Sequence, residues 1–391
     1  MNFFNETKSL VKVNIREYGM YIALFVIMLT FSIMTDGLFM SSRNISNLLD
    51  ATGYIAVLAV GMTLVIVIRH IDLSVGFAAG FMGAIAAILL TQAGLPFYFT
   101  IPIILVLGIV IGMFNGVLVA SFGIPAFVAS LAGMLIFRGG LLMVTEKSGT
   151  IIVDDENFNA IGTGFIPSIA KINGLNLLSL ILGGVMILLY IYSEISNRRS
   201  KLKYQFDVVS MRIFTVKVIF VSAIIAYITW ILAGYKGFSW TVIIMLIIVV
   251  VYHFLTRKTV LGRHIYAVGS NPEAAHLSGI NVKKITYIVF GSMGMLAALS
   301  GIMYTARLHS ATTTAGTLFE LDAIAAAYVG GVSAAGGVGK VTGSIIGAIV
   351  MASLTNGMNL LGVGISYQYM IRGAVLAAAV IFDVMTRKKR S

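Results

Sequence analysis

The most informative shortages in this chain of 391 residues are those of cysteine and of charge. With no cysteine, the chain can form no disulfide, thiol nucleophile or thiolate metal site. Only 11% of the residues are charged, whereas a soluble domain of this size carries roughly 25%. No polar stretch exceeds about 30 residues, and a folded soluble domain usually needs about 50. These shortages argue against a soluble enzyme, and any enzymatic activity is expected on another chain.

Long apolar runs take the place of the missing charge. Hydrophobic residues make up 59% of the chain, and runs of about 20 residues suffice to cross a hydrocarbon core of about 30 Å. We therefore predict an all-α polytopic membrane protein, a single transmembrane domain over residues 1–391 with about twelve spans, some of them broken. The spans lie near 20–38, 53–69, 73–92, 98–120, 125–144, 176–195, 212–234, 238–256, 285–306, 319–334, 340–361 and 367–386. The second, tenth and eleventh are the candidates for half-helices.

The positive charge is concentrated in four segments, although the net charge of +12 by itself would also suit nucleic acid. Basic residues near membrane spans mark the cytoplasmic side, so we place both termini there and expect no nucleic-acid partner. The four segments contain Lys8, Lys12 and Arg16; Arg198, Arg199, Lys201, Lys203, Arg212 and Lys217; Arg257, Lys258, Arg263, Lys283 and Lys284; and Arg387, Lys388, Lys389 and Arg390. The loop 145–175, which carries Asp154, Asp155 and Glu156, is then extracytoplasmic.

Two segments interrupt the apolar pattern at membrane depth, 69–76 (RHIDLSVG) and 330–343 (GGVSAAGGVGKVTG). Irregular backbone is tolerated there only where protein covers it or where it lines a polar cavity. In the first segment, Asp72 either marks a transport pathway or caps the following helix at the cytoplasmic end while pairing with Arg69. The second segment resembles a phosphate loop superficially, but Val341 follows Lys340 where serine or threonine is required, so the chain is not expected to bind ATP.

Three amides lie within predicted spans, at Asn115, Asn356 and Asn359. An amide both donates and accepts hydrogen bonds, which suits sugar hydroxyls, and bonding between helices is an equally good explanation. Glu320 and Asp322 begin a short span, where negative charge complements the helix dipole. No nucleophile, base or clustered ligands accompany these side chains, so we expect no catalytic and no metal site.

A short capped helix is predicted inside the basic loop 257–284. Asn271 suits the N-cap, Pro272 the first helical position, Glu273 the positive end of the dipole, and Gly279 the left-handed residue that stops a helix. The helix is expected to run from Pro272 to Ser278, and Ala274, Leu277 and Ser278 share one face, exposed to the cytoplasm. Such a surface is typical of a contact with a soluble partner.

Several strings in the order TDGLFMSSRNISNLL, AVGMTLVIV, IDLSVG, PAFVASLAGMLIFRGG, GSNPEAAHLSGINV, ELDAIAAAYVGG and TNGMNLLG run from about Thr35 onward. Together they resemble the permease subunits of bacterial monosaccharide ABC importers, the ribose/xylose/arabinose permease family. The similarity covers nearly the whole chain. It is greatest to the longer xylose and multiple-sugar permeases, which carry an extra helix pair matching 176–234 beside a ten-helix core.

The resemblance implies a multi-pass protein of the bacterial inner membrane with ATP and Mg²⁺ bound only by a partner ATPase. It also implies an extracytoplasmic sugar-binding protein, a second permease copy and membrane lipid as partners. The segment 269–281 is similar to the coupling loop that docks on the ATPase, which assigns that role to Asn271, Pro272, Glu273, Ala274, Ala275, Leu277 and Gly279. Arg69 and His70 depart from what many relatives have before the IDLSVG string, so a role for them is not carried over.

The resulting hypothesis is a permease for a pentose or hexose such as xylose, arabinose or galactose. Its pathway would be lined by amides, hydroxyls and aromatic rings, because a neutral sugar needs hydrogen bonds and stacking. The candidates are Asp72, Asn115, Phe127, Tyr328, Asn356 and Asn359. The alternative is an ion-coupled secondary sugar transporter in which Asp72, Glu320 or Asp322 titrates. A membrane enzyme or passive channel is less favoured, because it leaves the capped helix without a purpose.

Overall fold

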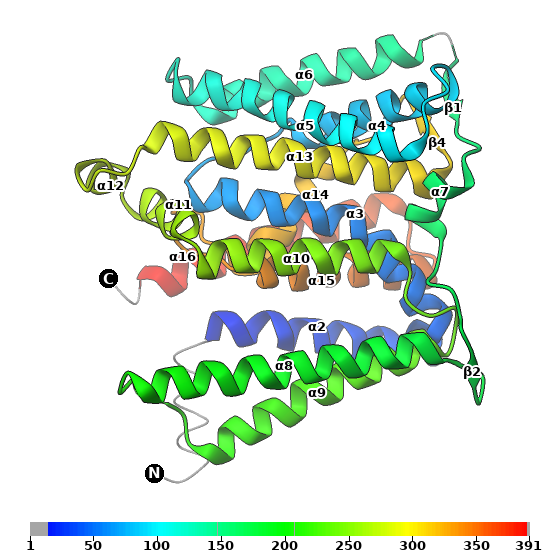
Figure 1. Cartoon of the computed structure of the whole chain (residues 1–391), viewed down its shortest axis with the longest axis vertical. Coiled ribbons are helices and arrows are strands. Elements are labelled where there is room, and N and C mark those ends of the chain that lie inside the picture. Colours follow the sequence, from blue (N-terminus) through cyan, green and yellow to red (C-terminus); the bar gives the residue numbers. More distant parts are fainter. Residues whose placement is uncertain (1–14, 147, 207, 389–391) are drawn as a thin grey trace.

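The computed structural model describes residues 15–146, 148–206 and 208–388, and helices make up most of this part of the chain. Figure 1 shows the long helices side by side, running between the two ends of the molecule. Within the described residues, nine helices are long and apolar enough to cross a membrane. They are α3 (Ser42–Val67), α5 (Phe97–Ala120), α6 (Ala126–Thr145), α8 (Leu177–Lys203), α9 (Met211–Ala233), α10 (Trp240–Lys258), α13 (Val282–Leu308), α15 (Val341–Leu360) and α16 (Ile365–Lys388). The predicted all-α polytopic fold is confirmed.

Three further helices match the remaining predicted spans: α2 (Ile15–Met34), α4 (Val75–Thr91) and α14 (Phe319–Val329). With 11 residues, α14 is about 16 Å long and is a half-helix, as predicted for the tenth span. The second and eleventh spans, α3 and α15, are continuous over 26 and 20 residues, so their expected interruption is wrong. The breaks lie between helices instead, because residues 68–74 and 330–340 leave the helical path before α4 and α15 begin.

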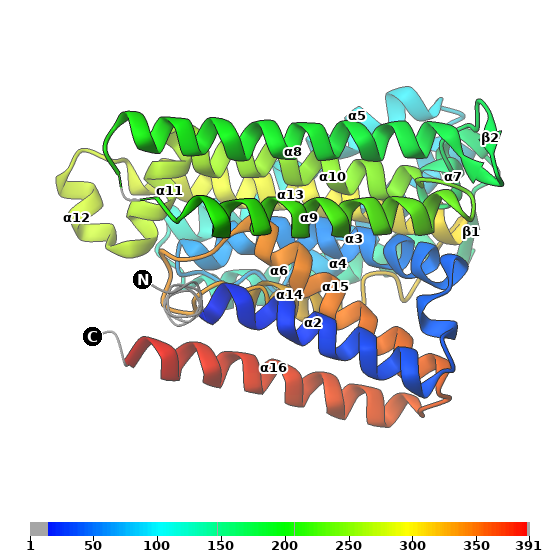
Figure 2. The ribbon, with the colours of Figure 1, turned by 90° about the horizontal axis from the view of Figure 1, so that it is seen from below.

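The two ends of the bundle differ in character, as Figures 1 and 2 show. One end holds the start of α2, the α8–α9 connection, α11 (Val260–Ser270), α12 (Pro272–Leu277) and the end of α16. The other end holds α7 (Glu156–Thr163), the strand pair β1 (Thr150–Ile152) and β4 (Ser310–Thr312), and the hairpin of β2 (Lys171–Ile172) and β3 (Leu175–Asn176). The predicted basic segments that the structure describes therefore meet at one end, and Lys8, Lys12, Lys389 and Arg390 lie outside the described residues.

Glycine lets the central helices approach backbone to backbone around α13. A Cβ on Gly108 would lie 2.6 Å from the Gly294 carbonyl oxygen, and one on Gly83 would lie 2.8 Å from the Gly301 carbonyl oxygen. These positions join α5 and α4 to α13, which is 27 residues long and largely buried. In lipid, such close packing replaces the hydrophobic drive that holds soluble cores together. The core that positions the polar residues is therefore built on small side chains.

The segment 176–234 forms the helix pair α8 and α9 at one edge of the bundle (Figure 1). The two helices pack on each other where Gly183 lies against Thr229. Most of the α8 surface is exposed, including Leu188, Leu189 and Tyr192. Such an apolar outer surface suits contact with lipid, and this pair adds little to the central core.

Candidate functional site

The helix α12 begins with the caps that its sequence predicts. The Asn271 side chain accepts a hydrogen bond from the backbone N–H of Ala274 at 3.0 Å, which satisfies one of the free N–H groups at the helix start. Pro272 and Glu273 occupy the first turn, where proline loses no helical hydrogen bond and a carboxylate faces the positive end of the dipole. Consecutive residues thus define the start of this helix.

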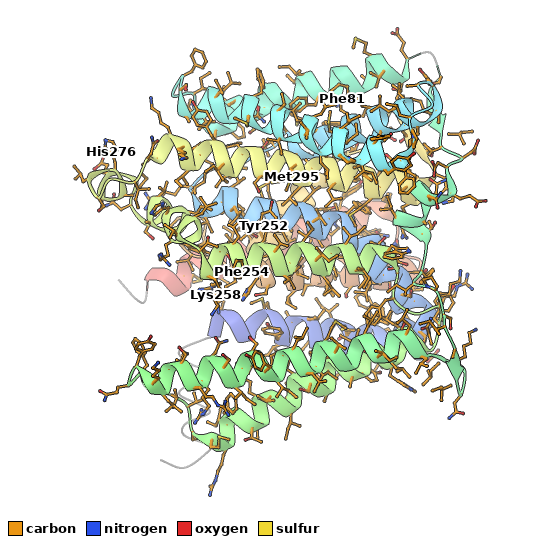
Figure 3. All side chains as sticks on the ribbon, in the orientation of Figure 1. Phe81, Tyr252, Phe254, Lys258, His276 and Met295 are labelled. Carbon is orange, nitrogen blue, oxygen red and sulfur yellow. The ribbon has the colours of Figure 1, made fainter. Side chains whose placement is uncertain are left out.

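Its C-terminal end and its exposed face also agree with the prediction, with one difference. Gly279 has a φ of 84° and stops the helix, but the last helical residue is Leu277 because Ser278 already leaves the helical conformation. Leu277 is 87% exposed, and Ala274 and Ser278 are exposed beside it, while Ala275 is buried beneath. A small, mostly apolar face therefore projects from the basic end of the molecule, as the position of His276 shows in Figure 3.

A second helix, α11, supports α12 and was not predicted. It starts one residue after α10, and Thr259 Oγ1 caps it by accepting a hydrogen bond from the Gly262 N–H at 3.1 Å. Ile265 and Val268 are buried against the bundle. The available signal was the spacing of Leu261, Ile265 and Val268 on one helix face, which the flanking glycines obscured.

Asp72 lies inside the bundle at the start of α4, with 2% of its surface exposed. Its Oδ1 accepts hydrogen bonds from the backbone N–H and the hydroxyl of Ser74, at 2.9 and 2.6 Å. The Asn115 amide on α5 donates to the same hydroxyl at 2.7 Å. These bonds fix the turn that leads into α4, but α4 begins at Val75 with Ser74 as its N-cap residue, so the predicted capping of a helix that starts at Leu73 by Asp72 is wrong.

The predicted pairing of Asp72 with Arg69 is also wrong. Arg69 adopts a left-handed conformation, with φ of 65°, and its guanidinium group donates to the carbonyl oxygens of Gly269 and Ser270 instead. The chain reverses between the two side chains, so Arg69 faces α11 and Asp72 faces the core. Arg69 and Asp72 are close in the sequence, but this reversal of the chain keeps their side chains apart.

A small cavity of about 10 Å³ adjoins this network, lined by Asp72, Ser74, Asn115, Phe137 and Gly294, among others. That volume is roughly the room one water molecule needs, and the buried Asn115 Oδ1 accepts no hydrogen bond within the described residues. The cavity is too small for a monosaccharide. In this conformation, the interior around Asp72 is closed.

The two short helices, α4 and α14, begin beside one another, which sequence reasoning missed. A Cβ on Gly76 would lie 2.5 Å from the Gly316 carbonyl oxygen and would also collide with Glu320 Oε2. Glu320 is 6% exposed, and within the described residues its Oε2 has no hydrogen-bond partner. As predicted, Glu320 and Asp322 occupy the first turn of α14. Half-helix N-termini such as that of α14, in a membrane interior, are the geometry with which transporters hold polar cargo.

An aromatic cluster that includes Phe319, at the start of α14, adjoins this contact and combines rings from three different helices. Tyr54 of α3, Tyr304 of α13 and Phe319 of α14 form a triangle with ring centroids 4.9 to 5.1 Å apart. Both tyrosines are partly exposed. On α14, Asp322 forms an ion pair with Arg372 of α16. No sequence spacing connects these residues, so only the fold reveals the cluster.

The other predicted pathway residues are dispersed. Asn356 exchanges two hydrogen bonds with Asn44, at 2.9 and 3.1 Å, and Asn359 accepts one from Gln368 at 2.8 Å, so both amides join helices. Phe127 is 56% exposed near the start of α6. Tyr328 is partly buried on α14. The structure brings Asp72 and Asn115 together but does not gather all six candidates into one site.

A larger hollow of about 420 Å³ lies at the opposite end from α12. It is lined by residues of α7 and of the turn after α13, including Asp154, Glu156, Asn159, Thr163 and His309. Asp155 caps α7 by accepting from the Phe158 N–H at 2.9 Å, which holds this acidic edge in place. The end predicted to be extracytoplasmic thus offers an acidic concave surface.

Comparisons with known proteins agree with this architecture. A family model described as "Branched-chain amino acid transport system / permease component" matches residues 44–380. The chain is 40% identical to the xylose transport system permease protein XylH of Haemophilus influenzae, over 97% of this chain and 99% of that protein. It is 36% identical to XylH of Escherichia coli K12, over 99% and 95%. It is 34% identical to the ribose import permease protein RbsC of Haemophilus influenzae, over 94% and 93%.

No solved structure matches the chain. The extent of the family match and the shared length exclude a chance likeness of isolated motifs, and they fit a multi-pass protein of the bacterial inner membrane. The chain belongs to the permease family of branched-chain amino acid transport system components, together with the xylose and ribose permeases.

Proposed function

We propose that the chain is the membrane-spanning permease of an ATP-driven importer of monosaccharides. The favoured substrate is a pentose such as xylose. The observation that carries this proposal is α12, a capped helix with an exposed apolar face at the basic end of the bundle. Leu277 projects from this capped helix with 87% of its surface exposed, which suits a surface that docks on a soluble partner. The printed functions of the xylose and ribose permease relatives support the sugar.

The partner at α12 is a cytoplasmic ATPase, since the chain has no nucleotide-binding loop of its own. The coupling surface comprises Asn271, Pro272, Glu273, Ala274, Leu277 and Gly279, whereas Ala275, which the sequence also assigned to it, is buried and supports this surface from beneath. ATP hydrolysis would move α12 together with α11 and switch the spans between outward-open and inward-open states. Because the caps make α12 a rigid short element, it transmits the movement without unwinding.

The sugar would pass near the N-terminal ends of α4 and α14. Tyr54 and Tyr304 supply aromatic surface and hydroxyls, and Asn115 supplies an amide whose Oδ1 is free to accept. Asp72, Phe127, Tyr328, Asn356 and Asn359 complete the proposed pathway, in a conformation more open than the one described here. A second permease copy would form the other wall, and lipid would cover the apolar outer helices.

At the opposite end, the acidic hollow around Asp154 and Glu156 would receive an extracytoplasmic sugar-binding protein. A concave surface with two carboxylates favours a partner that presents basic side chains. This assignment accounts for a surface that the sugar itself, being neutral, does not require.

The substitution Leu277→Asp tests the role of α12. We expect the protein to insert in the membrane normally but to lose coupling, so that ATP hydrolysis by the reconstituted complex no longer drives xylose uptake, because a charge replaces the apolar contact. Leu202→Asp is the matched control, since Leu202 is 52% exposed at the same end on α8. Normal sugar-stimulated uptake by Leu277→Asp would remove the coupling role.

A further inference from the structure

Three segments that are far apart in the sequence meet directly behind α12. They are the end of α3 (67–69), the end of α11 (269–270) and the glycine loop between α14 and α15 (336–337), and we name their contact the α11 junction. The last residue of α11, Ser270, is followed immediately by the N-cap of α12. A displacement of α12 therefore acts directly on this junction.

Arg69 joins α3 to α11 through its guanidinium group. Its Nε donates to the Gly269 carbonyl oxygen at 2.6 Å, and its Nη2 donates to the Ser270 carbonyl oxygen. These carbonyls lie in the last turn of α11, where the partial negative charge of a helix concentrates. The planar fork of arginine engages two neighbouring acceptors at once, which lysine with its single ammonium group cannot do in the same geometry.

The backbones at the junction leave no room for slippage. A Cβ on Gly269 would collide with the Val67 carbonyl oxygen and come within 2.8 Å of the Gly337 nitrogen. The Gly337 N–H donates to the same Val67 carbonyl at 2.8 Å. Glycine at 269 is thus required by close approach, and the ends of α3 and α11 form one packed unit with the glycine loop.

A further hydrogen bond ties α11 to the glycine loop. The Tyr266 hydroxyl donates to the Gly339 carbonyl oxygen at 2.6 Å. Within the same loop, the Ser333 hydroxyl donates to Asp383 of α16 at 3.2 Å. The loop therefore links α11 on one side to α14, α15 and α16 on the other.

Both interrupted segments of the chain, 69–76 and 330–343, take part in the α11 junction. Asp72, with its buried bonds to Ser74, lies three residues beyond Arg69, at the start of α4. The glycine loop directly follows α14. The helices α4 and α14, which begin beside Gly76 and Gly316, are thus both connected to α11 through short, hydrogen-bonded segments.

We propose that Arg69 is a positioning residue that couples α12 to the translocation pathway, by holding the end of α11 to the end of α3 as one moving body. The proposal rests on the proposed function, since it presumes that an ATPase moves α12. Arg69 itself lies at the surface, so its removal leaves no buried cavity and the fold should tolerate substitution. Its side chain acts on coupling and does not touch the sugar.

The test compares Arg69→Gln, Arg69→Lys and wild type in proteoliposomes that contain the complete transporter with its ATPase and binding protein. The measured quantity is radiolabelled xylose taken up per ATP hydrolysed. For Arg69→Gln we expect the ratio to fall about tenfold, within the usual range of coupling between distant sites, while ATPase binding and the rate of hydrolysis stay near wild type. Arg69→Lys should recover part of the ratio, because it restores the positive charge at the C-terminal end of α11 but not the planar fork of arginine.

Arg199→Gln is the control, because Arg199 is exposed at the same end on α8 and the substitution removes the same charge. Tyr266→Phe should lower the ratio by a smaller factor, because it removes only one hydrogen bond of the junction. An unchanged ratio in Arg69→Gln, or no difference between Gln and Lys, would overturn the proposal. If wild type itself shows no ATP-driven uptake, the proposed function fails instead, so the two failures are distinguishable.

Discussion

The two interrupted segments of this protein, 69–76 and 330–343, differ in what holds them in place. The first is fixed by side chains, since the Asp72 carboxylate, the Ser74 hydroxyl and the Asn115 amide form a buried chain of hydrogen bonds. The second is fixed mainly by backbone, because its glycines adopt left-handed conformations or lie against other main chains. Substitutions in the first segment are therefore expected to matter through the hydrogen bonds they remove, and substitutions in the second through the side-chain volume they add.

The largest effect should come from adding one methyl group to the second segment. Gly343→Ala would drive a Cβ into the Gly330 carbonyl oxygen, a backbone atom that cannot turn away. We expect the protein to lose about 3 kcal/mol of stability, the upper range for overpacking, and to unfold at a lower temperature in detergent. Gly373→Ala in α16, where nothing lies within 4 Å, is the control and should not destabilise the protein, because alanine is the better helix former. Equal melting temperatures for the two variants would contradict the size argument.

In the first segment, two substitutions of Asp72 separate the effect of a lost hydrogen-bond acceptor from the effect of a lost charge. Asp72→Ala leaves the buried N–H of Ser74 without its acceptor, at a cost of about 2 kcal/mol, and uptake should fall with it. Asp72→Asn keeps an acceptor oxygen and should retain most of the uptake. If Asp72→Asn abolished transport while folding normally, Asp72 would titrate during the cycle, as the ion-coupled alternative requires.

The amides should have a smaller effect on stability and a visible one on transport. Asn115→Ala removes the hydrogen bond to Ser74, and Asn359→Ala removes the one from Gln368, each worth about 1 kcal/mol. If the proposed pathway is correct, xylose uptake should fall several-fold in both variants at equal protein levels in the membrane. Unchanged uptake in both would show that these amides only join helices.

The smallest effect is expected at the entrance to α14. Asp322 and Arg372 form an ion pair with about a quarter of each side chain exposed. Asp322→Asn should change stability by less than about 1 kcal/mol, the usual worth of a partly solvated pair. Thermal unfolding and uptake should both stay near wild type. A complete loss of uptake would instead point to a titrating Asp322.

The sequence predicted the features that consecutive residues determine. Apolar runs located the helices, and the caps at Asn271 and Gly279 defined α12 to within one residue. It did not predict α11, whose glycines have low helix propensity but allow close contact, Gly262 with α10 and Gly269 with the end of α3.

Contacts between distant segments were likewise hidden. The bonds from Arg69 to Gly269 and Ser270 span about 200 positions, and the Tyr54, Tyr304 and Phe319 rings come from three helices. The false pairing of Arg69 with Asp72 arose because sequence proximity does not reveal the reversal of the chain between them.

The central claim, that ATP hydrolysis on a partner drives sugar through this permease, is tested most directly by one uptake measurement. Proteoliposomes with the permease, its ATPase and its binding protein would be loaded with ATP, and ionophores would collapse the proton and sodium gradients. The account predicts that xylose still accumulates and that accumulation stops when ATP is withheld. Accumulation that needs an ion gradient and ignores ATP would contradict it.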